Sequence, residues 1–122
     1  MVSNQRLGKW GEIKAKQYLE GKGIKIMATN IRTPYGELDL IGMDDSQVVF
    51  FEVKTRTSTA FGFGEQAISE TKQQHLIDSA EAYMQEHSDL GDDWRIDAII
   101  IDGSPLRNKI EIRWFKNAVS ND

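Results

Sequence analysis

Three charged residues, Asp39, Glu52 and Lys54, lie inside apolar runs that are typical of β-strands. Because side chains alternate between the two faces of a strand, Glu52 and Lys54 point to one side while Phe51 and Val53 point to the other. Two carboxylates beside a lysine supply oxygen ligands for a hard cation and a positive charge near an attacking water. The pattern predicts a magnesium-dependent enzyme that hydrolyses phosphodiester bonds.

The expected cofactor is Mg²⁺, with Mn²⁺ as a second ion that would bind. On adjacent strands about 4.8 Å apart, the carboxylates of Asp39 and Glu52 can share one cation or bridge a pair. Mg²⁺ is small and oxygen-seeking, and it commonly takes one or two protein carboxylates and leaves its other positions to water and phosphate. Lys54 can orient the attacking water or offset charge that develops on the phosphoryl oxygens.

The elements that position these residues follow from apolar periodicity and turn residues. We expect helices over 4–20 and 69–87, strands over 24–30, 37–42, 48–56, 95–101 and 109–114, and a surface loop over 57–64. The short turn after the second strand favours an antiparallel hairpin, which brings Asp39 near Glu52. The almost wholly apolar strand 95–101 is expected to be parallel, with the second helix as its crossover, and the residues after the last strand are expected to fray.

The order α-β-β-β-α-β-β predicts a mixed central sheet flanked by helices, of the α/β or α+β class. With 122 residues we expect a single domain, 1–122. There is no cysteine, and no apolar run approaches the roughly 18 residues that a membrane span needs, so we expect a cytoplasmic protein without a thiolate zinc site or a membrane segment.

The net charge of −4 is unevenly distributed along the chain. Residues 1–56 contain nine basic and seven acidic residues, whereas the remainder contains six basic and twelve acidic residues. If some acids of the first half bind metal, the surface there is more basic than the count suggests. A nucleic-acid partner is therefore compatible with the overall acidity.

An aspartate in one strand followed by Glu-x-Lys in the next is the signature of the PD-(D/E)xK nuclease superfamily. Further motifs follow in order along the chain: Gly8-x-x-Gly11-Glu12, Ala15, Tyr18-Leu19, Asn30-x-Arg32, Gly36-Glu37-Leu38-Asp39-Leu40-Ile41, Phe51-Glu52-Val53-Lys54-Thr55-Arg56, Ala67 and Lys72. This succession covers nearly the whole chain and resembles the YraN-like bacterial family, which is usually described as uncharacterised and as similar to archaeal Holliday-junction resolvases. Leu38 replaces the proline of the superfamily motif, a departure that is common in the resolvase-like branch.

The resemblance implies a restriction-endonuclease-like core and an endonuclease that cleaves DNA, with branched or structured DNA as a candidate substrate. It implies Lys54 as the catalytic lysine and Glu12, on the first helix, as a third catalytic acid. The metal ligands that it implies are Asp39, Glu52, Val53 and Glu12. Resolvase-like relatives often act as symmetric dimers, so a homodimer is expected by analogy, with the exposed face of strand 109–114 as its candidate contact.

Four further residues are candidates for contact with nucleic-acid phosphates: Arg56, Thr55, Lys72 and Arg32. Glu37 shares the face of Asp39 by alternation and is a candidate fourth acid, although we expect a solvated position beside the turn. The alternative function is a non-catalytic nucleic-acid-binding or protein adaptor that keeps the nuclease fold, which the small size and net acidity would suit. The sequence leaves the choice between DNA and RNA open.

Overall fold

The computed structural model describes residues 3–57 and 68–120, and most of the expected loop 57–64 lies outside this part. The described elements are α1 (Asn4–Gly21), β1 (Lys25–Thr33), β2 (Gly36–Asp44), β3 (Gln47–Arg56), α2 (Glu70–Glu86), the short 3₁₀ helix η2 (Ser88–Leu90), β4 (Trp94–Asp102) and β5 (Glu111–Val119). The strands form one sheet in the order β1-β2-β3-β4-β5, in which β3 and β4 are parallel and the other neighbours are antiparallel. The predicted mixed sheet with flanking helices is confirmed.

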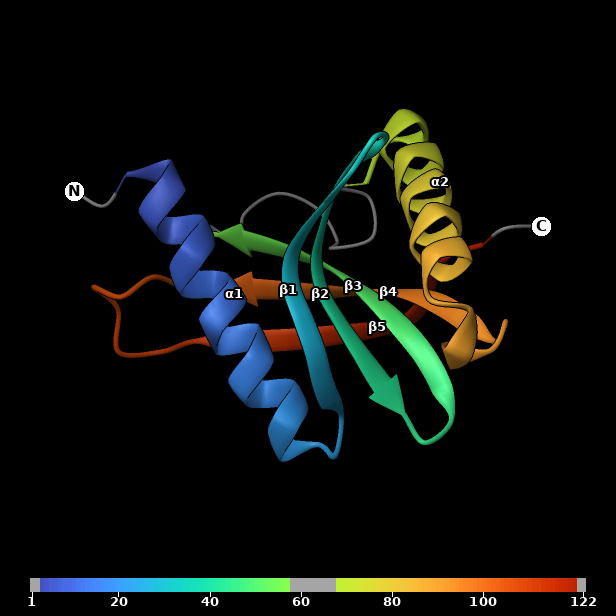
Figure 1. The fold of residues 1–122 in the computed structure, drawn as a ribbon. Coiled ribbons are helices and arrows are strands. Elements are labelled where there is room, and N and C mark those ends of the chain that lie inside the picture. The colour runs from blue at the N-terminus through green and yellow to red at the C-terminus, as the bar shows by residue number, and fades with distance from the viewer. Residues whose placement is uncertain (1–2, 58–67, 121–122) are drawn as a thin grey trace.

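The two helices cover different faces of the sheet and create two apolar clusters. Ala15 and Leu19 of α1 pack with one set of strand residues, which includes Phe51. Leu76 and Ala80 of α2 pack with the other set. Figure 1 shows the strongly twisted sheet, in which β1 and β2 run steeply and β4 and β5 run almost level, with α1 and α2 well apart. The twist lets both helices approach the middle strands β2 and β3, which contain the predicted site.

Serine residues define where both helices begin. The side chain of Ser3 accepts a hydrogen bond from the backbone N–H of Arg6, and that of Ser69 accepts one from Lys72. Such caps satisfy N–H groups that have no partner within the first helical turn. The second helix was expected to begin at residue 69, and Ser69 is its N-cap, which fixes the start of α2 and with it the position of Lys72. None of the helices in the described ranges is long and apolar enough to cross a membrane.

The last strand differs from its prediction in position and length. We expected a strand over 109–114 followed by frayed residues, but β5 continues to Val119, which is buried and lies opposite Ile96. The side chain of Asp97 on β4 accepts hydrogen bonds from the backbone N–H of Asn117 (2.7 Å) and from the indole of Trp114 (2.9 Å). The prediction was wrong because this partner is twenty residues away and leaves no trace in local periodicity.

Candidate metal centre

Asp39 lies where the regular pairing of β2 with β3 ends. The paired residues run from Asp44 opposite Gln47 to Leu40 opposite Phe51. The next residue of β2 is Asp39, and its Oδ2 accepts a hydrogen bond of 2.9 Å from the backbone N–H of Val53. The carboxylate is therefore held against β3 by a main-chain donor, at the edge of the paired region.

Glu52 on β3 lies close enough to Asp39 to change its protonation, as the hairpin prediction required. Burial, the largest effect, and then repulsion by the Glu52 carboxylate raise the pKa of Asp39 from 3.8 to about 8, against the opposing effect of the Val53 N–H. With both acids ionised, Glu52 Oε1 is buried and accepts no hydrogen bond from a described residue. A proton on Asp39 lets the two carboxyl groups share a hydrogen bond, which also raises the pKa of Asp39. The pair therefore keeps a proton at neutral pH unless a cation replaces it.

Two further acids lie beside Asp39, Glu12 from α1 and Glu37 from the same strand. Carboxylate oxygens of Glu12 on α1 and of Glu37 and Asp39 on β2 all lie within 4.8 Å of one another. All three side chains are half-buried. Glu12 therefore lies beside Asp39, and Glu37, for which we expected a solvated position, belongs to the same group.

Asn30 on β1 joins two of these acids. Its side-chain amide donates to Glu12 Oε1 (2.9 Å) and to Glu37 Oε1 (3.4 Å), while its own oxygen accepts from the ammonium of Lys9 (3.0 Å). Its backbone is left-handed, with φ of 51°, a conformation that asparagine adopts more readily than most residues. Sequence reasoning missed this role, and the polar side chain at the end of an apolar run was the available signal.

The close approach of α1 to the sheet places Glu12. A Cβ atom at Gly11 would lie 1.8 Å from Oγ1 of Thr55, so only glycine fits at this contact. Gly11 therefore lets α1 approach β3 closely. Gly8, one helical turn earlier, has no such role, because a Cβ there would meet nothing within 4 Å.

The two lysines near the acids differ from the sequence-based expectation. Lys54 is exposed, and no hydrogen bond or ion pair joins it to another described residue. The ammonium of Lys72, from α2, lies 3.4 Å from Glu52 Oε2. In this structure the lysine that contacts Glu52 is therefore Lys72 and not Lys54.

The other candidate phosphate contacts have different surroundings. Arg56 is only 15% exposed and its guanidinium binds Asp102 on β4, at 3.0 Å. The hydroxyl of Thr55 lies beneath α1 against Gly11. Arg32 is exposed and lies 3.9 Å from Glu37. Thus Arg32 and Lys72 border the acids, whereas Arg56 and Thr55 already contact other parts of the protein.

The chemistry of these side chains fits a divalent cation. Four carboxylates come from α1, β2 and β3, and such hard oxygen ligands suit Mg²⁺ or Mn²⁺. A buried carboxylate oxygen without a donor, such as Glu52 Oε1, is costly unless a proton or cation satisfies it. Val53 contacts the group through the N–H that donates to Asp39.

Comparison with known proteins agrees with the motifs. The uncharacterised protein family UPF0102 matches residues 11–101. The chain belongs to this family. A UPF0102 protein of Marinobacter nauticus is 40% identical over 119 residues, which are 98% of this chain and 96% of the relative. One of Dehalococcoides mccartyi is 35% identical over 120 residues, 98% of each chain. The predicted YraN-like membership, within the restriction-endonuclease-like superfamily, is confirmed.

Among solved structures, SfsA of Pyrococcus furiosus in complex with Ca²⁺ is similar to this UPF0102 protein at a TM-score of 0.41 and 15% identity. The match covers 95% of this chain and 64% of SfsA.

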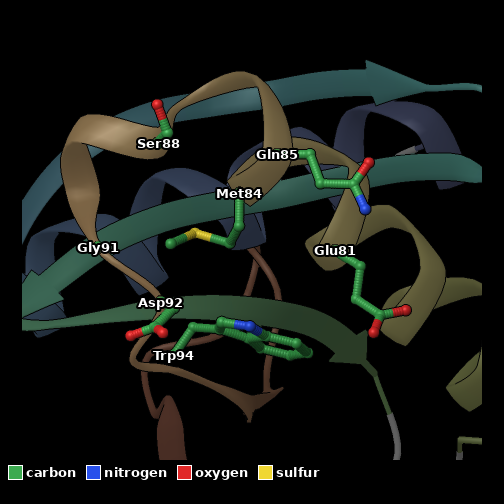
Figure 2. A pocket seen from close by; sticks show the side chains of 7 residues that line it. All are labelled: Glu81, Met84, Gln85, Ser88, Gly91, Asp92 and Trp94. Carbon is green, nitrogen blue, oxygen red and sulfur yellow. The ribbon is translucent and has the colours of Figure 1, made fainter.

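Of two hollows on the surface of the UPF0102 protein, one lies beside the acids and the other lies away from them. One of about 180 Å³ adjoins them, and it is lined by Lys9, Glu12, Ile13, Lys16, Thr29, Asn30 and Leu40. A larger groove of about 580 Å³ lies at the end of α2, lined by Glu81, Met84, Gln85, Ser88, Gly91, Asp92 and Trp94 (Figure 2). Its charged lining is acidic and disfavours phosphate. Of these two, the smaller hollow is the one that adjoins the acids and has lysines in its lining.

Proposed function

We propose that this UPF0102 protein is a metal-dependent endonuclease that hydrolyses phosphodiester bonds in DNA, with branched or structured DNA as its preferred substrate. The observation that carries the proposal is the convergence of acidic side chains from α1, β2 and β3 on Asp39. Placing several acids together in a half-buried position is costly for a fold. Binding a hard cation would offset that cost.

Asp39 and Glu52 would hold the ion, with Glu12 and Glu37 completing its surroundings directly or through water. A bound Mg²⁺ or Mn²⁺ would supply an acidified water and stabilise charge on the phosphoryl oxygens. The ion must displace the proton that Asp39 holds at neutral pH. Asn30 would keep Glu12 and Glu37 in position through its two hydrogen bonds.

The surrounding cations would bind the nucleic acid. Lys54 is exposed and unpaired among the described residues, so it can extend to the phosphate that reacts. Lys9 and Lys16 line the hollow beside Glu12 and would contact neighbouring phosphates. These contacts recognise the backbone, so preference for a branched substrate would come from the shape of the DNA.

Cleavage assays test the proposal. Purified protein is incubated with labelled branched, duplex and single-stranded DNA, and with RNA, in Mg²⁺ or Mn²⁺. We expect Asp39→Asn and Glu52→Gln to reduce cleavage at least about 100-fold, because each removes a charge from the metal centre. Glu81→Gln, on the acidic groove, should have no effect.

Two outcomes would contradict the proposal. Cleavage that persists in Asp39→Asn and Glu52→Gln would come from another site or from a contaminant. An absence of both cleavage and Mn²⁺ binding in calorimetry would favour the non-catalytic adaptor instead.

The homodimer and the cytoplasmic location stay predictions. β5 is an edge strand of the sheet, and Ile110, just before it, is an exposed apolar residue, as a contact between two copies would require. Sedimentation equilibrium of the wild type and of Ile110→Glu tests the dimer. A dimer should dissociate more readily in the variant, and a wild-type monomer at all concentrations would contradict the prediction.

A further inference from the structure

The ion pair between Lys72 and Glu52 links α2 to the metal centre. The ammonium of Lys72 lies 3.4 Å from Glu52 Oε2, and Glu52 forms no ion pair with another described cation. The side chain of Glu52 is 12% exposed, whereas that of Lys72 is 42% exposed. One partner is thus confined within the site, and the other reaches it from the surface.

The two oxygens of Glu52 have different environments. Oε2 faces the lysine, while Oε1 is buried and, when Asp39 is ionised, lacks a hydrogen-bond donor among the described residues. A divalent ion bound by Glu52 would lie a few ångströms from the ammonium of Lys72 and would repel it. The metal and the lysine therefore compete for the same carboxylate.

Lys72 can leave Glu52 without unfolding the helix that carries it. Its backbone N–H caps α2 through Ser69, but this bond does not involve the ammonium. The side chain is flexible and partly in solvent, so its charged end can move to another anion. In the proposed function the anion that arrives at this place is a backbone phosphate of the nucleic acid.

We propose that Lys72 is an exchangeable counter-cation: it neutralises Glu52 in the metal-free protein, is displaced by a divalent ion, and then binds a phosphate of the nucleic acid. The inference rests on the proposed function, because it takes Glu52 as a metal-binding residue. Metal and nucleic acid then strengthen each other's binding through Lys72, and this coupling is reciprocal. A permanent ion pair would stabilise α2 but would neither compete with the metal nor couple metal binding to nucleic-acid binding.

Calorimetric titration with Mn²⁺ alone tests the competition. Lys72→Met removes the ammonium and keeps a good helix-forming residue of similar length. It should bind Mn²⁺ about fivefold more tightly than the wild type or more, while Lys72→Arg should bind it no more tightly. Lys25→Met is the matched control. It also removes one exposed positive charge, but at the start of β1, whereas Asn30, which contacts the acids, lies further along the strand.

Fluorescence anisotropy with a labelled DNA duplex tests the second half of the proposal, with the DNA checked for cleavage on a gel. Saturating Mn²⁺ should raise the DNA affinity of the wild type and of Lys25→Met about fivefold. The increase should fall below about twofold in Lys72→Met. An equal increase in Lys72→Met would overturn the coupling.

The outcomes separate this inference from the proposed function. If the wild type binds Mn²⁺ and a folded Lys72→Met protein binds it equally or less tightly, the proposed exchange of Lys72 is wrong. Cleavage of DNA by the wild type would still support the proposed function in that case. If neither protein binds Mn²⁺, the metal-dependent function and the exchange both fail. Circular dichroism of each variant shows that the fold is intact.

Discussion

At the scale of single residues, Asp39 shows how the site works against the stability of the fold. Its carboxyl group is ionised in the unfolded chain. When the protein folds, this group becomes buried and lies next to a second acid, Glu52. Among the described residues, the backbone N–H of Val53 is the one hydrogen-bond donor to the Asp39 carboxylate. The side chain therefore makes the metal-free protein less stable above its normal pKa, and this cost is understandable if its function is to bind a cation.

The stability of the metal-free protein should reveal this cost through its pH dependence. The folded-state pKa of Asp39, about 8, is above the unfolded value of 3.8, so its contribution to stability falls as pH rises between these values. The side chain in Asp39→Asn cannot ionise, and it keeps an oxygen that can accept the hydrogen bond from the backbone N–H of Val53. Between pH 5 and pH 9, we expect the stability advantage of the variant over the wild type to grow by about 4 kcal/mol.

Urea denaturation in EDTA at pH 5 and pH 9 measures this difference. The advantage of Asp39→Asn should be small at pH 5, where the wild-type carboxyl is also protonated in the folded state. Added Mg²⁺ should stabilise the wild type and not the variant. Equal differences at both pH values would mean that the pKa of Asp39 is not raised.

At the scale of secondary-structure elements, the position of α1 decides whether Glu12 reaches Asp39. The contact between Gly11 and Thr55 has no space for a methyl group. In Gly11→Ala the new Cβ would push α1 away from β3. We expect a loss of about 2 kcal/mol in the free energy of unfolding, together with weaker Mn²⁺ binding as Glu12 moves from the other acids.

The matched control is Gly8→Ala, one helical turn earlier, where a Cβ would meet nothing within 4 Å. Alanine favours the helix over glycine, so this variant should be about 0.5 kcal/mol more stable and bind Mn²⁺ normally. Denaturation and calorimetry measure both properties. A Gly11→Ala protein that behaves like Gly8→Ala would show that the close contact does not position Glu12.

Another long-range contact determines the extent of β5. Asp97 on β4 is fully buried and binds Arg95, the indole of Trp114 and the N–H of Asn117. Asp97→Ala would leave these donors without their acceptor. We expect a loss of about 3 kcal/mol in the free energy of unfolding, because the Trp114 indole and the Asn117 N–H lose their acceptor and Arg95 loses one of its two carboxylate partners, Asp44 being the other.

Hydrogen exchange should locate this loss in β5, with the largest increase in exchange between Trp114 and Val119. Asp92→Asn, an exposed position in the acidic groove, serves as the control and should change stability by less than about 0.5 kcal/mol. An unchanged exchange rate at Asn117 in Asp97→Ala would contradict the anchoring role.

At the scale of the whole molecule, charge is separated between the helices. α1 contains four basic and two acidic residues, and two of its lysines line the hollow beside the acids. From Gln73 to Asp93 there are six acidic residues and no lysine or arginine. A polyanion should therefore approach the side of α1 and avoid the groove of Figure 2.

Salt-dependent DNA binding tests this orientation. Lys16→Ala should weaken binding about threefold to tenfold and reduce the slope of log affinity against log salt by about 1, because one phosphate contact is lost. Glu81→Ala changes an exposed charge on the acidic side and should change neither quantity. Equal effects of the two substitutions would mean that DNA does not bind along α1.

Local patterns in the sequence were enough to predict most of the fold. Alternation placed Asp39 and Glu52 on neighbouring strands, the short turn made them an antiparallel pair, and the apolar run of β4 required a parallel position in the sheet. Ser69 marked the start of α2. These features depend on residues close together in the chain, so periodicity and turn chemistry reveal them.

The sequence by itself thus determined the family, the mixed sheet and the two central acids. Only the tertiary structure decided that Glu37 and Asn30 join Glu12, that Lys72 rather than Lys54 contacts Glu52, and that β5 continues to Val119. Each of these contacts joins side chains from different elements. These contacts depend on the twist of the sheet, on the left-handed backbone conformation of Asn30 in β1 and on where the pairing of β2 with β3 ends. No local pattern in the sequence specifies those three features together.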